Sequence, residues 1–319
     1  MQMRGGIDVG GTNIQAAVID QRHRVMGKAK VPTPRHGGPA EVVEAMCTAV
    51  RLAADKAEIE TPDLVGVGAG LPGAVDSQAG TLARASNLPN WKKPYPLAAK
   101  LEEELGCPAF LGNDVGVALE AECRLGAGRG FHSLLGVFWG TGVGGGIVLN
   151  GQRWTGRHAA GEFGHLVIER NGRPCACGGH GHLEAYAGRR AMEARARKKE
   201  RKGVKTNLFT LMKDRKKDRL TSGVWERAVR SRDPLAGDIL HEALDAIAAG
   251  MASAINLLDV EAVVLGGGMG LRFGLSHAGT LQDWLKPRLF NPAEPPALLI
   301  AGLGDLGGSI GAALLVPEA

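Results

Sequence analysis

The chain has 319 residues, of which 44% are hydrophobic, 22% are charged and 4% are aromatic. That length predicts about two globular domains, and the ordinary apolar fraction, with 48 glycines in no strict period, excludes collagen, a coiled coil and wholesale disorder. The formal net charge is +5, but residues 189–219 hold 14 Lys and Arg against four acidic residues, so the basic character is regional.

Strands and helices alternate in the first half of the chain. An apolar strand at Met3–Val9 runs into Gly10-Gly11-Thr12, and a second strand at Ile14–Asp20 follows at hairpin distance. The other elements predicted here are a helix at Ala40–Ala57, a strand at Leu64–Gly70, a helix at Leu97–Leu105, a strand at Ala109–Gly112 and a helix at Val115–Leu125. This alternation predicts an α/β fold.

The second half begins with the same pattern. A strand at Ser133–Trp139 runs into the glycine-rich Gly140–Gly146 and then a strand at Ile147–Leu149, which suggests an internal duplication. The later elements are a helix from Asp233 to near Asp259, strands at Glu261–Leu265 and Ala297–Ala301, and a helix around Ile310–Leu315. We place the domain boundary near Asn113, with a smaller domain of residues 1–112 completed by about 302–319 and a larger domain of residues 113–301.

Neither a leader, a membrane span nor a disulfide scaffold is predicted. Met1 is followed by Gln-Met-Arg-Gly-Gly, without the apolar region of a secretory signal. No run of about 18 apolar residues is free of charges and glycine clusters. The five cysteines are an odd number. We therefore expect a soluble, cytoplasmic protein.

Three glycine turns follow apolar strands, at Gly10-Gly11-Thr12, Gly140–Gly146 and Gly266–Gly268. Bare backbone amides in such turns can bind an anion, so the set favours a nucleotide site, although each turn alone could be a hairpin connection. No P-loop motif occurs, and the two G-x-G-x-x-G strings, at residues 68–73 and 140–145, do not open helices, so NAD is not predicted. Asp8 could hold Mg²⁺ or its waters against phosphates, or simply cap the first turn.

The segment Asp8-Val9-Gly10-Gly11-Thr12 resembles the D-x-G-G-T phosphate motif of the ROK family (repressors, open reading frames, sugar kinases). Later motifs follow in that family's order, so the resemblance covers nearly the whole chain. It implies two actin-like (ribonuclease H-like, hexokinase-like) domains with a cleft between them, using ATP and Mg²⁺. The implied phosphate-binding residues are Asp8, Gly10, Gly11, Thr12, Gly140, Thr141, Gly142, Gly266, Gly267 and Gly268.

Asn113-Asp114 stands where a short strand meets a helix, a position at which either residue is a common helix cap. The pair also resembles the family's N-D-x-N motif, although Gly116 replaces the usual Asn. That resemblance implies that Asp114 is the general base for the sugar 6-hydroxyl and that Asn113 binds sugar hydroxyls. The other implied sugar-binding residues are Gly70, Asn87, Glu162, His165 and Glu184.

Residues 175–182 concentrate thiols and imidazoles in the sequence Cys-Ala-Cys-Gly-Gly-His-Gly-His. Such a set suits tetrahedral zinc, while a reduced surface loop and a redox pair remain alternatives. The family pattern has a third Cys where this chain has His182, so the resemblance implies the ligands His165, Cys175, Cys177 and His182, with His180 as a spare. Four protein ligands imply a structural Zn²⁺.

The basic segment 189–219 has one aromatic residue, Phe209, so nucleic-acid binding is not favoured. A solvated face is the default, and a more specific hypothesis is that the charges attract ATP or a longer polyphosphate. The resemblance implies an ATP-dependent hexose kinase, most simply a glucokinase, acting as a dimer or tetramer. Alternatives are an N-acetylhexosamine, mannose or fructose kinase, or a sugar-sensing regulator, although the sequence before Asp8 has no room for a helix-turn-helix module.

Overall fold

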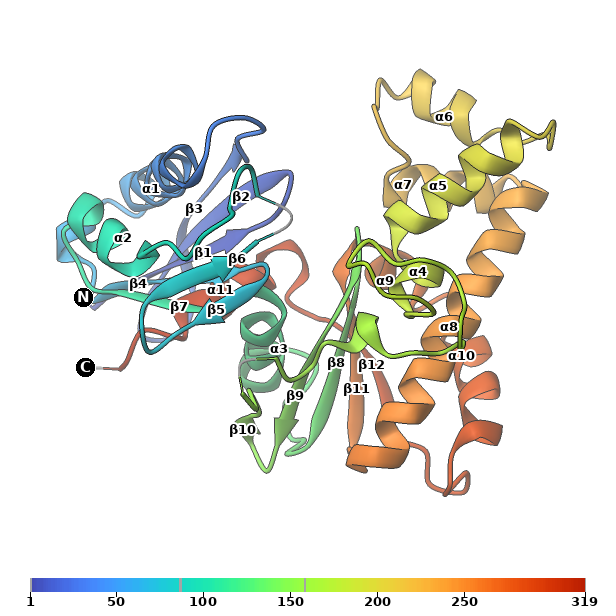
Figure 1. Ribbon diagram of the computed structural model, residues 1–319. Helices are drawn as coiled ribbons and strands as arrows, with labels where there is room; N and C mark the ends of the chain where they lie inside the picture. The colour runs from blue at the N-terminus through green and yellow to red at the C-terminus, as the bar shows by residue number, and fades with distance from the viewer. Residues whose placement is uncertain (1, 86–87, 158, 319) are drawn as a thin grey trace. The chain divides into compact units, whose positions relative to one another are not determined.

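Two compact units make up the computed structural model, which describes residues 2–85, 88–157 and 159–318 (Figure 1). The first unit comprises Met1–Gly130, Thr155–Ala160 and Gly302–Ala319, and the second comprises Phe131–Trp154 and Gly161–Ala301. Each unit has its own apolar cluster, built largely from aliphatic side chains as the low aromatic content requires.

A five-stranded sheet in the order β3-β2-β1-β4-β7 forms the centre of the first unit. β1 pairs antiparallel with β2 and parallel with β4, and β4 pairs parallel with β7. The strands are β1 (Arg4–Val9), β2 (Asn13–Ile19), β3 (Val25–Pro32), β4 (Gly66–Leu71) and β7 (Ala109–Asn113). β4 is buried along its whole length, because a parallel strand inside a sheet is covered on both faces.

The helices of the first unit are α1 (Pro39–Lys56), α2 (Leu97–Leu105), α3 (Asp114–Leu125) and α11 (Gly307–Ala313), with short helices η1 (Thr61–Asp63) and η4 (Gly304–Leu306) and a hairpin of β5 (Ala74–Asp76) and β6 (Thr81–Arg84). α11 packs directly on the sheet at Gly6 and Gly68. A Cβ atom at these positions would lie 1.9 Å from the carbonyl oxygen of Ser309 and 1.8 Å from that of Ala312. Gly68 therefore allows the close packing of α11 on the sheet.

The second unit repeats this topology. Its sheet has the order β10-β9-β8-β11-β12, in which β8 pairs antiparallel with β9 and parallel with β11, and β11 pairs parallel with β12. The strands are β8 (Leu134–Trp139), β9 (Val143–Leu149), β10 (Gln152–Arg153), β11 (Ala262–Gly266) and β12 (Ala297–Ile300). The predicted α/β fold and the suggested duplication are confirmed at the level of strand order and direction.

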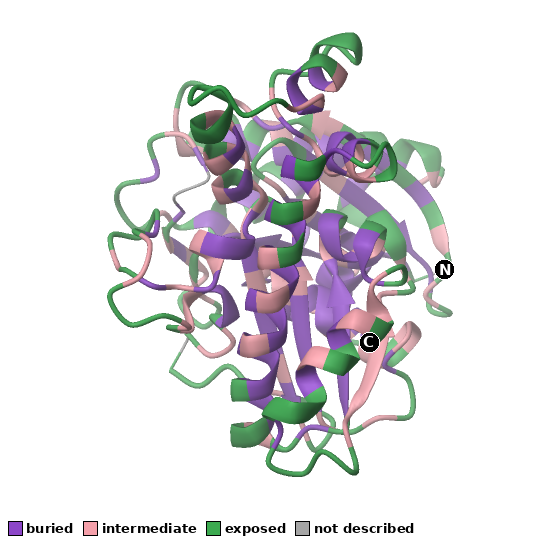
Figure 2. Ribbon diagram, turned by 90° about the vertical axis from the view of Figure 1, so that its right-hand side faces the viewer, coloured by how far each residue is buried: buried purple, intermediate pink, exposed green. Residues whose placement is uncertain are grey.

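The helices of the second unit carry both buried and exposed residues along their length (Figure 2). They are α4 (Glu184–Ala187), α5 (Arg189–Glu200), α6 (Leu208–Asp214), α7 (Ser222–Arg230), α8 (Pro234–Leu258), α9 (Gly267–Phe273) and α10 (Ala278–Leu285), with short helices η2 (Phe163–His165) and η3 (Lys286–Arg288). None of the helices in the described residues has the length and hydropathy to cross a membrane.

The division between the units lies after Gly130, later than the predicted boundary near Asn113. α3 stays with the first unit because it packs on α11 and carries Glu122, a buried carboxylate that accepts hydrogen bonds from the backbone N–H groups of Gly302 and Leu303 at 2.9 and 2.8 Å. The strand predicted at Ile147–Leu149 also starts earlier, at Val143, because the intervening glycines pair with β8.

Candidate functional site

Polar residues of the first unit gather at the carboxyl ends of its parallel strands. Asp8 on β1 is paired with Gly70 on β4, and Gly70 is paired with Gly112 on β7, immediately before Asn113 and Asp114. The β1–β2 turn, Gly10-Gly11-Thr12, opens at the same edge. Ligands of open α/β sheets bind at this kind of edge, so five of the predicted site elements meet where binding is favoured.

The turn Gly10-Gly11-Thr12 of the first unit is held from one side by Thr33. The Thr33 hydroxyl donates to the carbonyl oxygen of Gly10 at 2.6 Å, and the Thr33 N–H donates to the carbonyl oxygen of Thr12 at 3.1 Å. Gly11 and Thr12 themselves are exposed. The turn is therefore fixed through the carbonyl groups of Gly10 and Thr12, and also through the Gly10 N–H, which donates to the carbonyl oxygen of Asn13 at 3.0 Å.

Asp8 is half-buried at the end of β1, and burial raises its pKa from 3.8 to about 6, an effect that nearby Lys30 partly offsets. A Cβ atom on Gly308, in the first turn of α11, would lie 2.7 Å from the Asp8 carboxylate. The carboxyl group is thus packed closely enough to α11 that its ionised form is poorly solvated. A cation at this position would compensate for that cost.

Asn113 and Asp114 form the start of α3. Asn113 is the N-cap residue, and its Oδ1 accepts a hydrogen bond from the N–H of Gly116 at 3.0 Å. Asp114 is the first helical residue, and its Oδ1 accepts from the N–H of Val115 at 2.9 Å. Asn113 therefore has the capping role, while Asp114 is a half-buried carboxylate beside Gly70 at the sheet edge.

The second unit contains a pocket of about 280 Å³ at the carboxyl ends of β8 and β11. Its lining residues are Gly140, Thr141, Arg189, Thr221, Ser222, Gly268 and Met269. The predicted glycine turns at Gly140–Gly142 and Gly266–Gly268 both contribute to it. Thr221, Ser222 and Met269 were not predicted, because no motif marks them, and Arg189 was predicted only as one charge of the basic segment 189–219.

Glu184 is tied to the first of these glycine turns. Its Oε2 accepts from the N–H of Val143 at 2.8 Å, and a Cβ atom on Gly142 would lie 2.1 Å from the same oxygen. Glu162 precedes η2, and its carboxylate lies 3.7 Å from Nε2 of His165. The predicted sugar-binding residues Glu162, His165 and Glu184 therefore all lie in the second unit. Asn87, another predicted sugar contact, lies outside the described residues.

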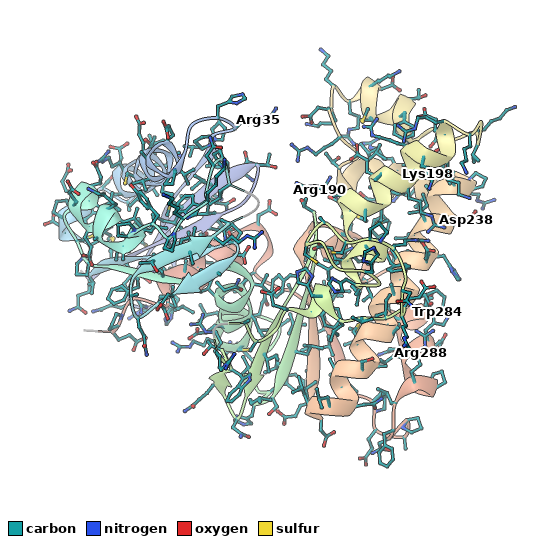
Figure 3. All side chains as sticks on the ribbon, in the orientation of Figure 1. Arg35, Arg190, Lys198, Asp238, Trp284 and Arg288 are labelled. Carbon is teal, nitrogen blue, oxygen red and sulfur yellow. The ribbon has the colours of Figure 1, made fainter. Side chains whose placement is uncertain are left out.

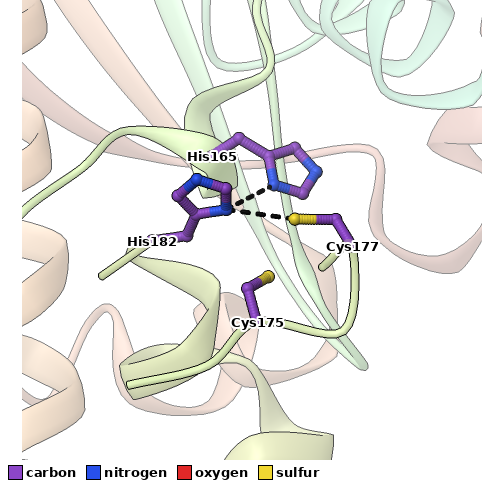
Figure 4. A group of neighbouring side chains, drawn as sticks. All are labelled: His165, Cys175, Cys177 and His182. Carbon is purple, nitrogen blue, oxygen red and sulfur yellow. Dashed lines mark hydrogen bonds between the residues drawn. The ribbon is translucent and has the colours of Figure 1, made fainter. Parts of the chain in front are cut away.

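Four of the predicted metal ligands converge in the second unit (Figure 4). The ligand atoms of His165, Cys175, Cys177 and His182 all lie within 4.8 Å of one another. Nδ1 of His182 is 3.2 Å from Sγ of Cys177 and 3.3 Å from Nδ1 of His165. Ligand atoms around tetrahedral zinc, at metal distances of 2.0–2.3 Å, lie about 3.3–3.8 Å apart, so the donor set fits that metal. The five cysteines of the chain are free thiols.

The loop that carries the cysteines is also anchored by side chains. The Arg173 guanidinium makes a bidentate ion pair with Glu242 on α8, at 2.6 and 2.8 Å, and stacks over the Tyr186 ring. The Tyr186 hydroxyl accepts from the N–H of Arg173 at 2.9 Å and donates to Glu169 at 2.5 Å. These contacts frame residues 169–182 independently of any metal.

Comparisons with known proteins agree with this geometry. The ROK family model matches residues 4–319. A glucokinase of Streptomyces coelicolor is 32% identical over 324 residues, which cover 98% of this chain and 97% of that protein. The solved structure of a ROK family glucokinase from Streptomyces griseus in complex with glucose and AMPPNP is 32% identical, with a TM-score of 0.80 over 98% of each chain. A ROK hexokinase structure from Thermus thermophilus is 33% identical, with a TM-score of 0.78 over 98% of this chain and 97% of that one.

Proposed function

Because this chain belongs to the ROK family, we propose that it is an ATP-dependent hexose kinase that phosphorylates the 6-hydroxyl of glucose. The observation that carries the proposal is the meeting of Asp8, Gly70 and Asp114 at one sheet edge. The similarity along the whole chain to a glucokinase solved with glucose and AMPPNP supports the choice of acceptor and donor.

Asp114 is the proposed general base. Its carboxylate would take the proton of the 6-hydroxyl as that oxygen attacks the γ-phosphorus and the bond to the β–γ bridging oxygen breaks, releasing ADP. Phosphoryl transfer needs mainly alignment and charge neutralisation, so one positioned carboxylate is sufficient protein chemistry. Asp8 would hold Mg²⁺ or its waters against the phosphates, since its poorly solvated carboxylate gains most from a cation.

The acceptor sugar would be bound by hydrogen-bonding side chains and backbone. We assign this role to Gly70, Asn87, Asn113, Glu162, His165 and Glu184. A hexose loses hydration at each hydroxyl when it is bound, so each hydroxyl needs a fixed partner. Glu184 is held in place by Val143 N–H, which supports its role as one of these partners.

The cluster of His165, Cys175, Cys177 and His182 would hold a structural Zn²⁺. The bound ion would supply a fixed four-ligand anchor and no open coordination position. Glu162 lies three residues before His165, and Glu184 lies two residues after His182. The bound ion would therefore hold both glutamates of the proposed sugar site in one conformation. Zinc would then affect sugar affinity more than the rate of phosphoryl transfer.

An ADP-release assay over a panel of hexoses tests the proposal, using purified protein supplied with zinc. We expect ATP- and glucose-dependent ADP release, a loss of at least about 10²-fold in kcat for Asp114→Asn, and near-normal glucose binding by that variant. Asp55→Asn, at an exposed position on α1, is the matched control. Activity on another hexose would correct the acceptor, and glucose binding without ADP release from any donor would instead support a sugar-sensing protein.

A further inference from the structure

Helix N-termini converge on the pocket of the second unit. α5 begins at Arg189 and α7 begins at Ser222 after the N-cap residue Thr221, so the pocket borders the first turns of both helices. Helix N-termini favour anions through their free N–H groups and their dipole. The Thr221 hydroxyl makes no capping hydrogen bond to its own helix, so it remains able to serve a ligand.

At the start of α5 the side chain of Arg189 is available to this pocket, whereas the first backbone N–H groups are not. The N–H groups of Arg189 and Arg190 donate to the carbonyl oxygens of Gly140 and Thr141, at 3.2 and 3.0 Å, so they bind the glycine turn. The Arg189 guanidinium then lies over the turn, where Nη2 donates to the Thr141 hydroxyl at 2.8 Å and Nη1 donates to the carbonyl oxygen of Leu220 at 2.9 Å.

These two contacts use two of the five N–H donors of a guanidinium. The side chain is only half-buried and lines the pocket, so the remaining donors can reach a bound anion. Both acceptors are neutral oxygen atoms, so neither hydrogen bond gives the positive charge of Arg189 an anionic partner, and Glu193 acts on that charge only through space. A phosphate group would provide that partner and would bind in a charge-assisted geometry.

We propose that Arg189 binds the phosphate groups of the phosphoryl donor, joining the phosphate pocket of the second unit to the basic segment that follows it. This assignment rests on the proposed kinase function. It also relates the basic segment to the pocket, because Arg189 at its start and Thr221, two residues after its end, both line the pocket. Figure 3 labels the next residue, Arg190, and Lys198 further along α5.

Arg189 could instead serve only as a clamp between Thr141 and Leu220. Two substitutions separate the roles. Arg189→Gln keeps a hydrogen-bond donor but removes the charge, whereas Arg189→Lys keeps the charge but loses the planar, two-pronged geometry. Arg227→Ala is the matched control, because it removes an exposed charge on α7 that lies outside the basic segment 189–219.

Titration calorimetry with AMPPNP and with adenosine provides the test, since only the first ligand carries phosphates. We expect Arg189→Gln to weaken AMPPNP binding by roughly tenfold or more and to leave adenosine binding unchanged, in line with the loss of a hydrogen bond to a charged group. Arg189→Lys should recover part of this loss, and Arg227→Ala should stay within about twofold of the parent. In turnover, the KM for ATP should rise while the KM for glucose stays constant.

Unchanged AMPPNP affinity in Arg189→Gln would overturn the assignment, as would an equal loss for AMPPNP and adenosine, because a clamp supports the whole pocket. If the parent protein binds neither AMPPNP nor ATP, the proposed donor fails first, and that result is seen before any variant is compared.

Discussion

The proposed zinc site depends on a glycine that makes room for an imidazole. A Cβ atom on Gly179 would lie 2.5 Å from Cε1 and 2.9 Å from Nε2 of His182, whereas ordinary contacts are 3.4–4 Å. In Gly179→Ala the ring would have to retreat by about 1 Å, but zinc tolerates changes in ligand distance of only about 0.2 Å. We expect zinc affinity to fall by about 10- to 100-fold, the usual cost of disturbing a residue that orients a ligand.

Zinc content after dialysis and competition with a chromophoric chelator measure this effect. The melting temperature in EDTA should change little, because without metal the ring can turn away and Arg173, Tyr186 and Glu242 still frame the loop. The double variant Gly179→Ala/His182→Cys should bind zinc as tightly as His182→Cys, because a thiol does not reach the space above residue 179. Parental zinc affinity in Gly179→Ala, or a further loss in the double variant, would refute the steric argument.

Three more expectations concern charge. Burial raises the pKa of Asp8 from 3.8 to about 6, so ionisation costs stability as the pH rises from 4 to 6; without Mg²⁺, Asp8→Asn should be more stable than the parent by about 3 kcal/mol at pH 7.5, and the difference should become small near pH 4 in urea melts. Glu122→Ala should lower the free energy of unfolding by about 3 kcal/mol, because three backbone N–H groups lose their acceptor; an unchanged urea midpoint would contradict this. The kcat/KM for ATP should fall with rising ionic strength more steeply than that for glucose, and equal slopes would argue against attraction of the donor by residues 189–219.

Hydrophobic period and glycine spacing predicted eight of the ten strands in the two five-stranded sheets, whereas the edge strands β3 and β10 were not predicted. The helix predicted at Leu97–Leu105 occupies those residues, and the long helix predicted from Asp233 is observed at Pro234–Leu258, because leucines and isoleucines recur on one face. For residues 189–219 only a solvated helix face and loop was predicted, without bounds, and the helix α7 was not predicted. α5 buries only Met192 and Ala196, so its sequence carries almost no amphipathic signal.

The site divides in the same way. The metal cluster was predictable because three of its ligands lie within eight residues, while the resemblance supplied His165 and the choice of His182 over His180. Arg189 was not, since its partners Thr141 and Leu220 are distant in sequence and are joined only by the fold. Glu122 was missed for a related reason: a single Glu inside a helix gives no indication that it binds a segment near the end of the chain.

The second unit is inserted, in sequence, within the first. During synthesis, residues 131–301 can leave the ribosome and fold while the sheet holding Asp8 and Asp114 still lacks α11. Until residues 307–313 emerge, the glycine-lined face at Gly6 and Gly68 is uncovered and exposes backbone to solvent or chaperones. A nonsense mutation near codon 300 would therefore leave the metal loop in the chain but remove α11. The sheet edge that holds Asp8 and Asp114 would then lose the helix that packs on it, although both residues are still synthesised.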